Sequence, residues 1–250
     1  MSAPDDVFVP APSSGRVFRS ARCVRLGDVR TDGRLRLDAL ARYLQDAGND
    51  DTMDRGVGNG GPWVARRTVV AIEGSRPRYL DEVELATFPG GRGRLVVERR
   101  TDITHERGVI RAATVWAYLD PTSMRPAAVP NWFDELYGAV TPDRKVSHRL
   151  QLATPDATAG RRPWPLRATD YDVLEHVNNA IAWAAIEDEL RQVADRARVV
   201  RAEVEYPGAI DIDDDVELVS QHDGESLQLW LTVGDEVRVA ARVLLAAAAR

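Results

Sequence analysis

The chain contains an internal repeat, and this repeat limits the folds available to it more than any other feature of the sequence. Residues 81–87 (DEVELAT) resemble residues 214–220 (DDVELVS), which stand 133 positions later. In both places the segment follows an expected strand, a proline-containing bend and an acidic turn, and two further strand patterns come after it. Because the similarity recurs at the same place among the elements, we interpret it as an internal duplication.

Each half of the sequence predicts one long helix and several strands. Apolar residues at helical spacing predict helices at 38–47 and 179–194. Alternating segments bounded by Gly, Pro and Asp predict the strands, which we place at residues 17–29, 63–72, 81–88, 94–103 and 109–119 in the first half, and at 198–206, 215–220, 227–233 and 237–246 in the second. This order predicts an α+β architecture in which each sheet covers its own helix.

Two segments lack such periodicity. Residues 1–15 are rich in Pro, Ser and Ala and are expected to form a loose arm. Residues 120–165 contain many prolines and little sustained pattern, apart from a short helical segment at 132–137. We interpret this second segment as a connector between the two halves.

Composition and charge exclude several classes of protein. The chain of 250 residues is long enough for two domains, and its net charge of −6 argues against a nucleic-acid partner. No apolar run reaches the roughly 18–20 residues of a membrane span, and the N-terminus lacks the pattern of a signal peptide. The single cysteine, Cys23, excludes an intrachain disulfide and fits a reducing compartment. We therefore expect a cytoplasmic protein with neither nucleic acid nor membrane as a partner.

Several apparent motifs do not fit the chemistry they suggest. The glycine-rich segment 56–61 follows a helix and precedes a strand, whereas dinucleotide binding requires the opposite order. The acidic segment 211–215 resembles a calcium loop, but Val216 and His222 stand where that loop needs glycine and glutamate. The four histidines and the cysteine have no zinc-like spacing, and no G-x-S-x-G motif occurs. We expect no metal and no cofactor.

One segment, residues 167–183, combines groups that can carry out acyl chemistry. Asp170, Asp172 and His176 stand in a loop that leads into a helix capped by asparagine. The backbone N–H groups at this helix end can polarise a carbonyl oxygen, while a carboxylate activates water or attacks directly. A thioester suits these groups because a thiolate leaves without strong acid assistance. The alternative is that these residues only stabilise a turn and cap the helix.

The same stretch resembles the D-x-D/N-x-x-x-H-V-N-N signature of hotdog-fold thioesterases, and 176–179 (HVNN) is its most specific part. Over residues 16–246 the tandem arrangement is similar to the acyl-acyl-carrier-protein (acyl-ACP) thioesterase family, with weaker first-half landmarks at 44–47 (LQDA), Trp63, Thr87, 113–116 (ATVW), Pro126 and Pro130. The resemblance implies a double hotdog, with two antiparallel sheets each wrapped around a long helix and packed as a pseudo-dimer. It implies an N-terminal hotdog at 16–132, a connector at 133–160 and a catalytic C-terminal hotdog at 161–250.

The resemblance also implies roles for individual residues. Asp172 falls on the acidic position used as base or nucleophile, His176 on the family histidine, and the amides of Val177, Asn178 and Asn179 on the oxyanion-binding helix end. Plant-type members have an asparagine where this chain has Leu174, and a Glu-Cys pair that residues 207–210 lack. Single-domain hotdog acyl-CoA thioesterases often manage with the aspartate and the helix N-terminus.

The first half has carboxylates in its corresponding loop, around residues 28–38, but neither a histidine nor an Asn-Asn pair. We therefore expect it to line the acyl pocket without catalysing the reaction, so that each chain has one site. Because two hotdogs in one chain reproduce the usual hotdog dimer, a monomer would suffice, although a homodimer is also possible.

Taken with the resemblance, the sequence predicts hydrolysis of fatty acyl thioesters, with ACP preferred over coenzyme A. A cluster of arginines would then receive the acidic carrier protein, unless these residues form only a solvated face. The candidates are Arg66, Arg67, Arg161, Arg162 and Arg167. The alternatives are an acyl-CoA thioesterase, a non-catalytic acyl-thioester-binding protein, and a dehydratase, for which the first half supplies no obvious partner residue.

Overall fold

The computed structural model describes residues 8–57, 61–193 and 197–247, which form two compact units. The first unit holds the chain up to Leu35 together with Tyr43–Arg149, and the second holds Arg36–Arg42 and the chain from Leu150 onward. Residues 1–7 of the expected arm, residues 58–60 of the glycine-rich segment and Ala194 lie outside the described residues. No helix in the described ranges is long and apolar enough to cross a membrane.

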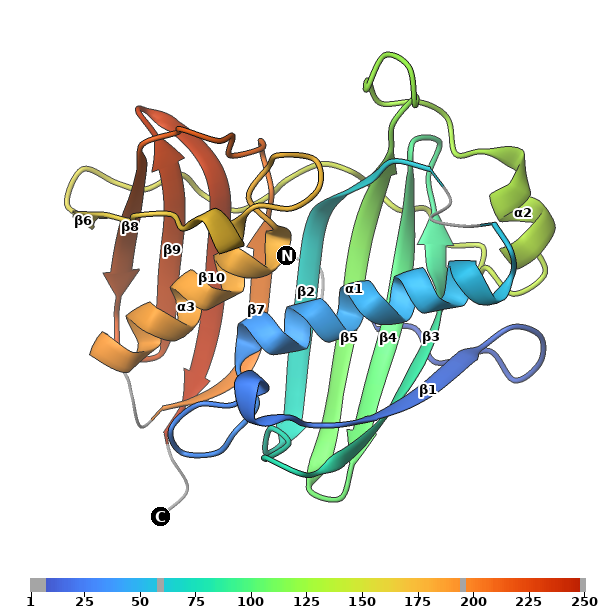
Figure 1. Ribbon diagram of the computed structural model, residues 1–250, viewed down its shortest axis with the longest axis horizontal. Coiled ribbons are helices and arrows are strands. Elements are labelled where there is room, and N and C mark those ends of the chain that lie inside the picture. Colours follow the sequence, from blue (N-terminus) through green and yellow to red (C-terminus); the bar gives the residue numbers. More distant parts are fainter. Residues whose placement is uncertain (1–7, 58–60, 194–196, 248–250) are drawn as a thin grey trace. The chain divides into compact units, whose positions relative to one another are not determined.

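In the first unit, five antiparallel strands run in the order β1-β3-β4-β5-β2. Helix α1 lies across one face of these strands (Figure 1), and its apolar side chains, such as Leu44 and Ala47, are buried there. The elements are β1 (Phe18–Cys23), α1 (Leu37–Asp54), β2 (Trp63–Gly74), β3 (Glu82–Arg92), β4 (Val96–His105) and β5 (Gly108–Tyr118). The start of α1, up to Arg42, belongs to the second unit. The helix and strands β2 to β5 lie where the sequence predicts them. The strand expected at 17–29 is shorter: it ends at Cys23, and residues 26–28 form a 3-10 turn, in which Asp28 Oδ2 accepts a hydrogen bond from Arg25 N–H (3.2 Å).

Helix α1 extends beyond residue 47, where its apolar spacing ends. Its last turns are held by a polar network around the fully buried Asp51. The Asp51 carboxylate accepts hydrogen bonds from Arg16 Nε (2.7 Å), Arg99 Nη1 (2.6 Å) and the Tyr137 hydroxyl (2.6 Å). Burial, together with the hydrogen bond to Asp51, raises the pKa of Tyr137. Polar contacts therefore replace apolar packing at this end of the helix.

Helix α2 (Asn131–Tyr137) forms where a short helical segment was expected. Phe133 and Tyr137 are buried against Val97 and Val129, with Trp63 packed beside them. These residues of the expected connector are therefore part of the core of the first unit.

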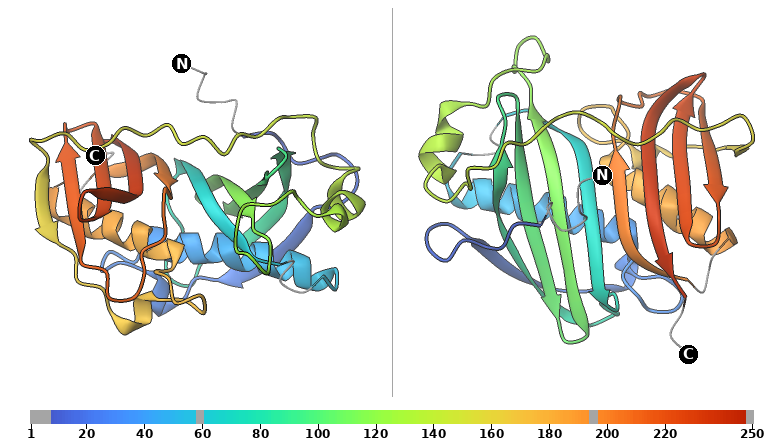
Figure 2. Two further views of the ribbon diagram at one scale, coloured as in Figure 1. Left: turned by 90° about the horizontal axis from the view of Figure 1, so that it is seen from above. Right: turned by 180° about the vertical axis from the view of Figure 1, so that it is seen from behind.

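In the second unit, five antiparallel strands run in the order β7-β10-β9-β8-β6. Helix α3 lies against them (Figure 2), with Trp183 and Ile186 almost fully buried. The elements are β6 (Gly160–Pro163), α3 (Asn179–Val193), β7 (Arg198–Glu205), β8 (Val216–His222), β9 (Ser226–Val233) and β10 (Glu236–Ala246). Strand β6 was not expected; it is a short edge strand, the position in a sheet where proline is tolerated.

The internal repeat has a structural counterpart at the turns that precede β3 and β8. Arg78 N–H donates to Asp81 Oδ2 (2.7 Å), and Asp211 N–H donates to Asp214 Oδ2 (2.8 Å). Within each turn the residue before the aspartate has a left-handed φ, 69° at Leu80 and 71° at Asp213. One helix against antiparallel strands, found in both units, agrees with the expected α+β architecture. The arrangement as two sheets packed as a pseudo-dimer stays a prediction.

Candidate active site in the second unit

Asp172 and His176 lie on one tight loop between the 3-10 turn η3 (Ala168–Asp170) and α3. Asp172 N–H donates to the His176 carbonyl (2.9 Å), and Glu175 N–H donates to the Asp172 carbonyl (3.0 Å). Glu175 closes the turn with a left-handed φ of 60°, a conformation that is rare for residues other than glycine. The backbone therefore brings the two predicted catalytic residues together.

The Asp172 carboxylate has both a structural and a free oxygen. Its Oδ1 accepts a hydrogen bond from Leu174 N–H (2.9 Å), which is the turn-stabilising role that the sequence left open. Its Oδ2 has no hydrogen-bond partner within the part of the chain that the structure describes, and the residue is only half-buried. The side chain can therefore hold the loop with one oxygen and offer the other to water or substrate.

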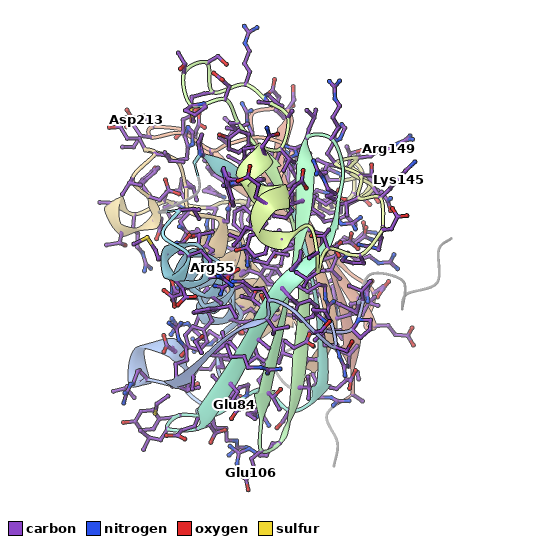
Figure 3. The ribbon with its side chains drawn as sticks, turned by 90° about the vertical axis from the view of Figure 1, so that its right-hand side faces the viewer. Arg55, Glu84, Glu106, Lys145, Arg149 and Asp213 are labelled. Atoms are coloured by element: carbon purple, nitrogen blue, oxygen red, sulfur yellow. The ribbon has the colours of Figure 1, made fainter. Side chains whose placement is uncertain are left out.

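His176 contacts a carboxylate that sequence reasoning did not assign to the site. Its Nε2 lies 3.3 Å from Oδ1 of Asp211, in the turn after β7. The two residues form an antiparallel backbone bridge, and the next amide, Val177 N–H, donates to the Ile210 carbonyl (2.9 Å). The acidic cluster was visible in the sequence, but only the fold places Asp211 opposite His176. Asp213, in the same turn, is exposed and extends away from the ribbon (Figure 3).

The start of α3 presents one available amide rather than three. Asn178 is the N-cap, because its Oδ1 accepts a hydrogen bond from Ala180 N–H (2.9 Å). Val177 N–H is bonded to a carbonyl, as described above, and Asn178 N–H donates to the Asp170 carbonyl (2.8 Å). Two of the three predicted oxyanion donors are therefore occupied. Among the described residues, Asn179 N–H has no partner, as expected for the first residue of a helix.

The first turn of α3 is fixed against the sheet by two aromatic residues. The Trp183 indole Nε1–H donates to the Tyr206 hydroxyl oxygen (3.0 Å), and that hydroxyl donates to the Asn179 carbonyl (3.3 Å). Because Trp183 is almost fully buried, this chain of hydrogen bonds sets the position of the helix end. The free amide of Asn179 therefore has a defined direction.

The corresponding loop of the first half, 142 positions earlier, has the same pattern of backbone hydrogen bonds, which we call the backbone frame. Arg30 N–H donates to the Arg34 carbonyl (2.8 Å), and Leu35 N–H donates to the Pro77 carbonyl (2.8 Å). Arg30 and Arg34 thus occupy the positions of Asp172 and His176. The frame is shared by the two halves, whereas the carboxylate and the imidazole occur only in the second.

The five arginines proposed as a carrier-binding surface have different surroundings. Arg66 and Arg67 lie on β2, in the first unit. In the second unit, Arg161 pairs with a carboxylate of β8 (3.1 Å), and Arg162 pairs with two carboxylates of α3 (2.9 and 3.0 Å). Arg167 is exposed and begins the loop that carries Asp172. Of the three in this unit, Arg167 is the one adjacent to the candidate site.

No group of three or more His, Cys, Asp or Glu side chains within the described ranges could hold a metal ion. The acidic turn uses Asp214 to accept the amide of Asp211. The groups that this loop carries are a carboxylate, an imidazole and a helix-end amide. These can activate a water, orient it and stabilise a negatively charged oxygen.

Both halves of the chain match models of one known protein family. Residues 15–137 match the acyl-ACP thioesterase N-terminal domain, and residues 154–241 match the C-terminal domain of the same family. An uncharacterised protein of Mycobacterium tuberculosis is 27% identical over 245 residues, which is 95% of each chain. The candidate site loop therefore lies within the C-terminal family domain.

Two solved structures share the fold along nearly the whole chain. The 12:0-ACP thioesterase from Umbellularia californica has a TM-score of 0.80 at 21% identity, covering 94% of this chain and 98% of that one. An acyl-ACP thioesterase from Bacteroides thetaiotaomicron has a TM-score of 0.73 at 19% identity, covering 92% and 98%. The fold is therefore hotdog-like, with antiparallel strands and few helices.

Proposed function

The chain belongs to the acyl-ACP thioesterase family, and we propose that it hydrolyses fatty acyl thioesters, with acyl-ACP as the preferred substrate, to release the free fatty acid. The observation that supports this proposal is the loop before α3, in which Asp172 Oδ2 and the Asn179 amide have no hydrogen-bond partner within the described chain, and His176 stands on the same turn as Asp172. These are the groups that thioester hydrolysis requires.

In the mechanism that we favour, Asp172 acts as general base. Its Oδ2 takes a proton from a water molecule as the water oxygen attacks the thioester carbonyl carbon. The carbonyl oxygen becomes negatively charged and is stabilised by Asn179 N–H at the positive end of the helix dipole. Collapse of the tetrahedral intermediate breaks the C–S bond and expels the thiolate, which takes up the proton held by Asp172, so that the fatty acid is released and the carboxylate is restored. Direct attack by Asp172 on the carbonyl carbon is the alternative.

His176 is assigned a supporting role, to orient the water or the substrate. Its half-exposed imidazole lies on the same turn as Asp172, but the two side chains make no contact among the residues that the structure describes. We assign hydrolysis to the hotdog at 161–250 and acyl-chain binding to the hotdog that begins at residue 16. Because Phe133 and Tyr137 pack in the core of the first unit, that hotdog includes α2, and the connection begins after Tyr137 rather than at residue 133. The two hotdogs would replace the two subunits of a single-domain dimer.

A panel of acyl thioesters tests the proposal directly. The protein is incubated with acyl-ACP and acyl-CoA of several chain lengths, and the released thiol is measured. We expect turnover, with a higher kcat/KM for acyl-ACP than for acyl-CoA of the same chain length. Saturable binding without thiol release would favour the non-catalytic acyl-binding alternative, and release from acyl-CoA alone would favour an acyl-CoA thioesterase.

A further inference from the structure

We infer that Asp211 is a positioning residue for His176, and that its carboxylate selects the orientation and tautomer in which the imidazole serves the reaction. The inference deepens the proposed function and rests on it. The direct observation is the 3.3 Å distance between Asp211 Oδ1 and His176 Nε2, across the antiparallel bridge that these two residues form.

The turn that carries Asp211 is fixed independently of the Asp211 side chain. Asp211 N–H donates to Asp214 Oδ2 (2.8 Å), Asp214 N–H donates to the Asp211 carbonyl (3.3 Å), and Asp213 supplies the left-handed residue. These contacts use the backbone of Asp211 and leave its carboxylate for His176. The carboxylate therefore projects from a rigid turn at a defined place.

The first half provides an internal comparison for this pair. Arg34 and Arg78 form the same antiparallel bridge, and Arg78 N–H donates to Asp81 as Asp211 N–H donates to Asp214. The bridge and the turn thus form without an acid–imidazole pair, so folding of the frame does not require one. The pair occurs in the half that also carries Asp172, which favours a role in the reaction over a role in the frame.

The energetic contribution of the pair to folding is small. The Asp211 side chain is 66% exposed and the His176 side chain 41% exposed, and ion pairs between exposed groups contribute little to stability. A carboxylate 3.3 Å from Nε2 does, however, favour the tautomer in which Nε2 carries the proton. Nδ1 is then left as the acceptor, able to hold a water in the orientation that Asp172 requires.

The test compares Asp211→Ala with Asp215→Ala, which removes an exposed carboxylate from the same turn. With the best thioester of the panel, we expect Asp211→Ala to lower kcat about tenfold with KM nearly unchanged, and Asp215→Ala to leave both unchanged. Asp211→Glu should recover part of the loss. In a His176→Ala background, Asp211→Ala should have no further effect. An equal loss in that background, or no loss in the wild-type background, would overturn the inference.

A second measurement does not depend on turnover. Nitrogen-15 NMR of the imidazoles, with His176 assigned by its loss in His176→Ala, reports which ring nitrogen is protonated. We expect the Nε2-protonated tautomer at neutral pH in the wild-type protein and a mixture of tautomers in Asp211→Ala. If no thioester is hydrolysed but this change is seen, the proposed function fails and the Asp211–His176 coupling stands. An unchanged tautomer in Asp211→Ala would refute the coupling itself.

Discussion

The two loops that lead into α1 and α3 share a backbone frame but differ in the hydrogen-bond partner of the first backbone N–H group of the helix. In the first half, Leu37 N–H donates to Oε1 of Glu187 (2.9 Å), a residue of α3 that is only 8% exposed. In the second half, the equivalent amide belongs to Asn179 and has no partner among the described residues. One helix end is closed by a carboxylate of the protein, and the other is open.

A carboxylate oxygen on a helix-end amide resembles the arrangement expected for the oxyanion of thioester hydrolysis. The Glu187 contact indicates that this frame can bind a negatively charged oxygen at the first amide of the helix. It also shows why the frame alone does not make a site, since in the first half the amide is already used. Arginines at positions 30 and 34 remove the base and the imidazole as well.

The largest effect is expected from Asp172→Asn. Removal of a general base lowers the rate by about 10²–10⁴-fold, so we expect kcat to fall at least a hundredfold. Asn can still accept the Leu174 amide, so circular dichroism should show a folded protein. The matched change in the first half is Asp32→Asn, since the Asp32 carboxylate also accepts a nearby amide, that of Arg34 (2.9 Å). If Asp32→Asn also abolished turnover, the first half would have a role in the chemistry.

The comparison next predicts one acyl-thioester binding site per chain. Calorimetric titration of the Asp172→Asn protein with the best acyl thioester should give one equivalent, because the first helix end is occupied by Glu187. Two binding equivalents would mean that the first half has a site of its own.

His176→Ala should weaken turnover less than Asp172→Asn does, because the amide of Asn179 can still stabilise the oxyanion.

Much of the fold and of the site can be predicted from the sequence, because the repeat and the apolar spacing are patterns of residues close together along the chain. The sequence places α3 and the strands other than β6, and it identifies Asp172, His176 and the Asn178 cap as neighbours. Strand β6 lacks alternation because it is a short edge strand ending in proline. The second half of α1 depends on the buried carboxylate of Asp51, which apolar spacing cannot reveal.

The remaining site features depend on segments that are distant in the sequence. Val177 N–H is occupied by the carbonyl of Ile210, and Asp211 reaches His176 from the same turn. Closure of the first helix end by Glu187 joins residues 150 positions apart. Sequence spacing identifies which groups are present in a loop, but tertiary contacts decide which of their atoms remain available.

Closure of the first helix end should also contribute to stability. A hydrogen bond to a charged group contributes about 1.5–3 kcal/mol, so Glu187→Ala should lower the free energy of unfolding by about that amount. Glu187→Gln retains an oxygen acceptor and should cost less, because only the charge is lost. Urea unfolding at neutral pH measures both variants. Equal losses for the two variants would mean that the amide contact does not account for the effect.

A smaller, pH-dependent contribution to the free energy of unfolding is expected from Asp38, at the start of α1. Burial alone would raise the pKa of this carboxyl, but hydrogen bonds from Arg36 and Arg42 outweigh it and lower the pKa. Its contribution to stability is therefore present above the pKa of the unfolded chain and is lost as the pH falls through the folded pKa. The matched residue of α3 is Ala180, which cannot titrate.

We expect Asp38→Asn to be less stable than the wild-type protein at neutral pH and to approach it as the pH falls into the acid range. Urea unfolding across that range measures the difference between the two proteins. A difference that stays constant with pH would show that the two arginines do not stabilise the charged form of Asp38.

The smallest expected effect on the free energy of unfolding comes from the residue with a left-handed backbone conformation in each loop. Gly33 has a φ of 79°, whereas Glu175 has a φ of 60° at the matched position, next to His176. A side chain in this conformation costs roughly 1–2 kcal/mol, but glycine loses more conformational entropy on folding. We therefore expect Glu175→Gly to raise the free energy of unfolding by no more than about 1 kcal/mol, and Gly33→Ala to lower it. If Glu175→Gly instead destabilises the protein, the Glu175 side chain makes a favourable contribution that outweighs its backbone strain. Activity measured alongside would then show whether that contribution supports Asp172 and His176 or the fold alone.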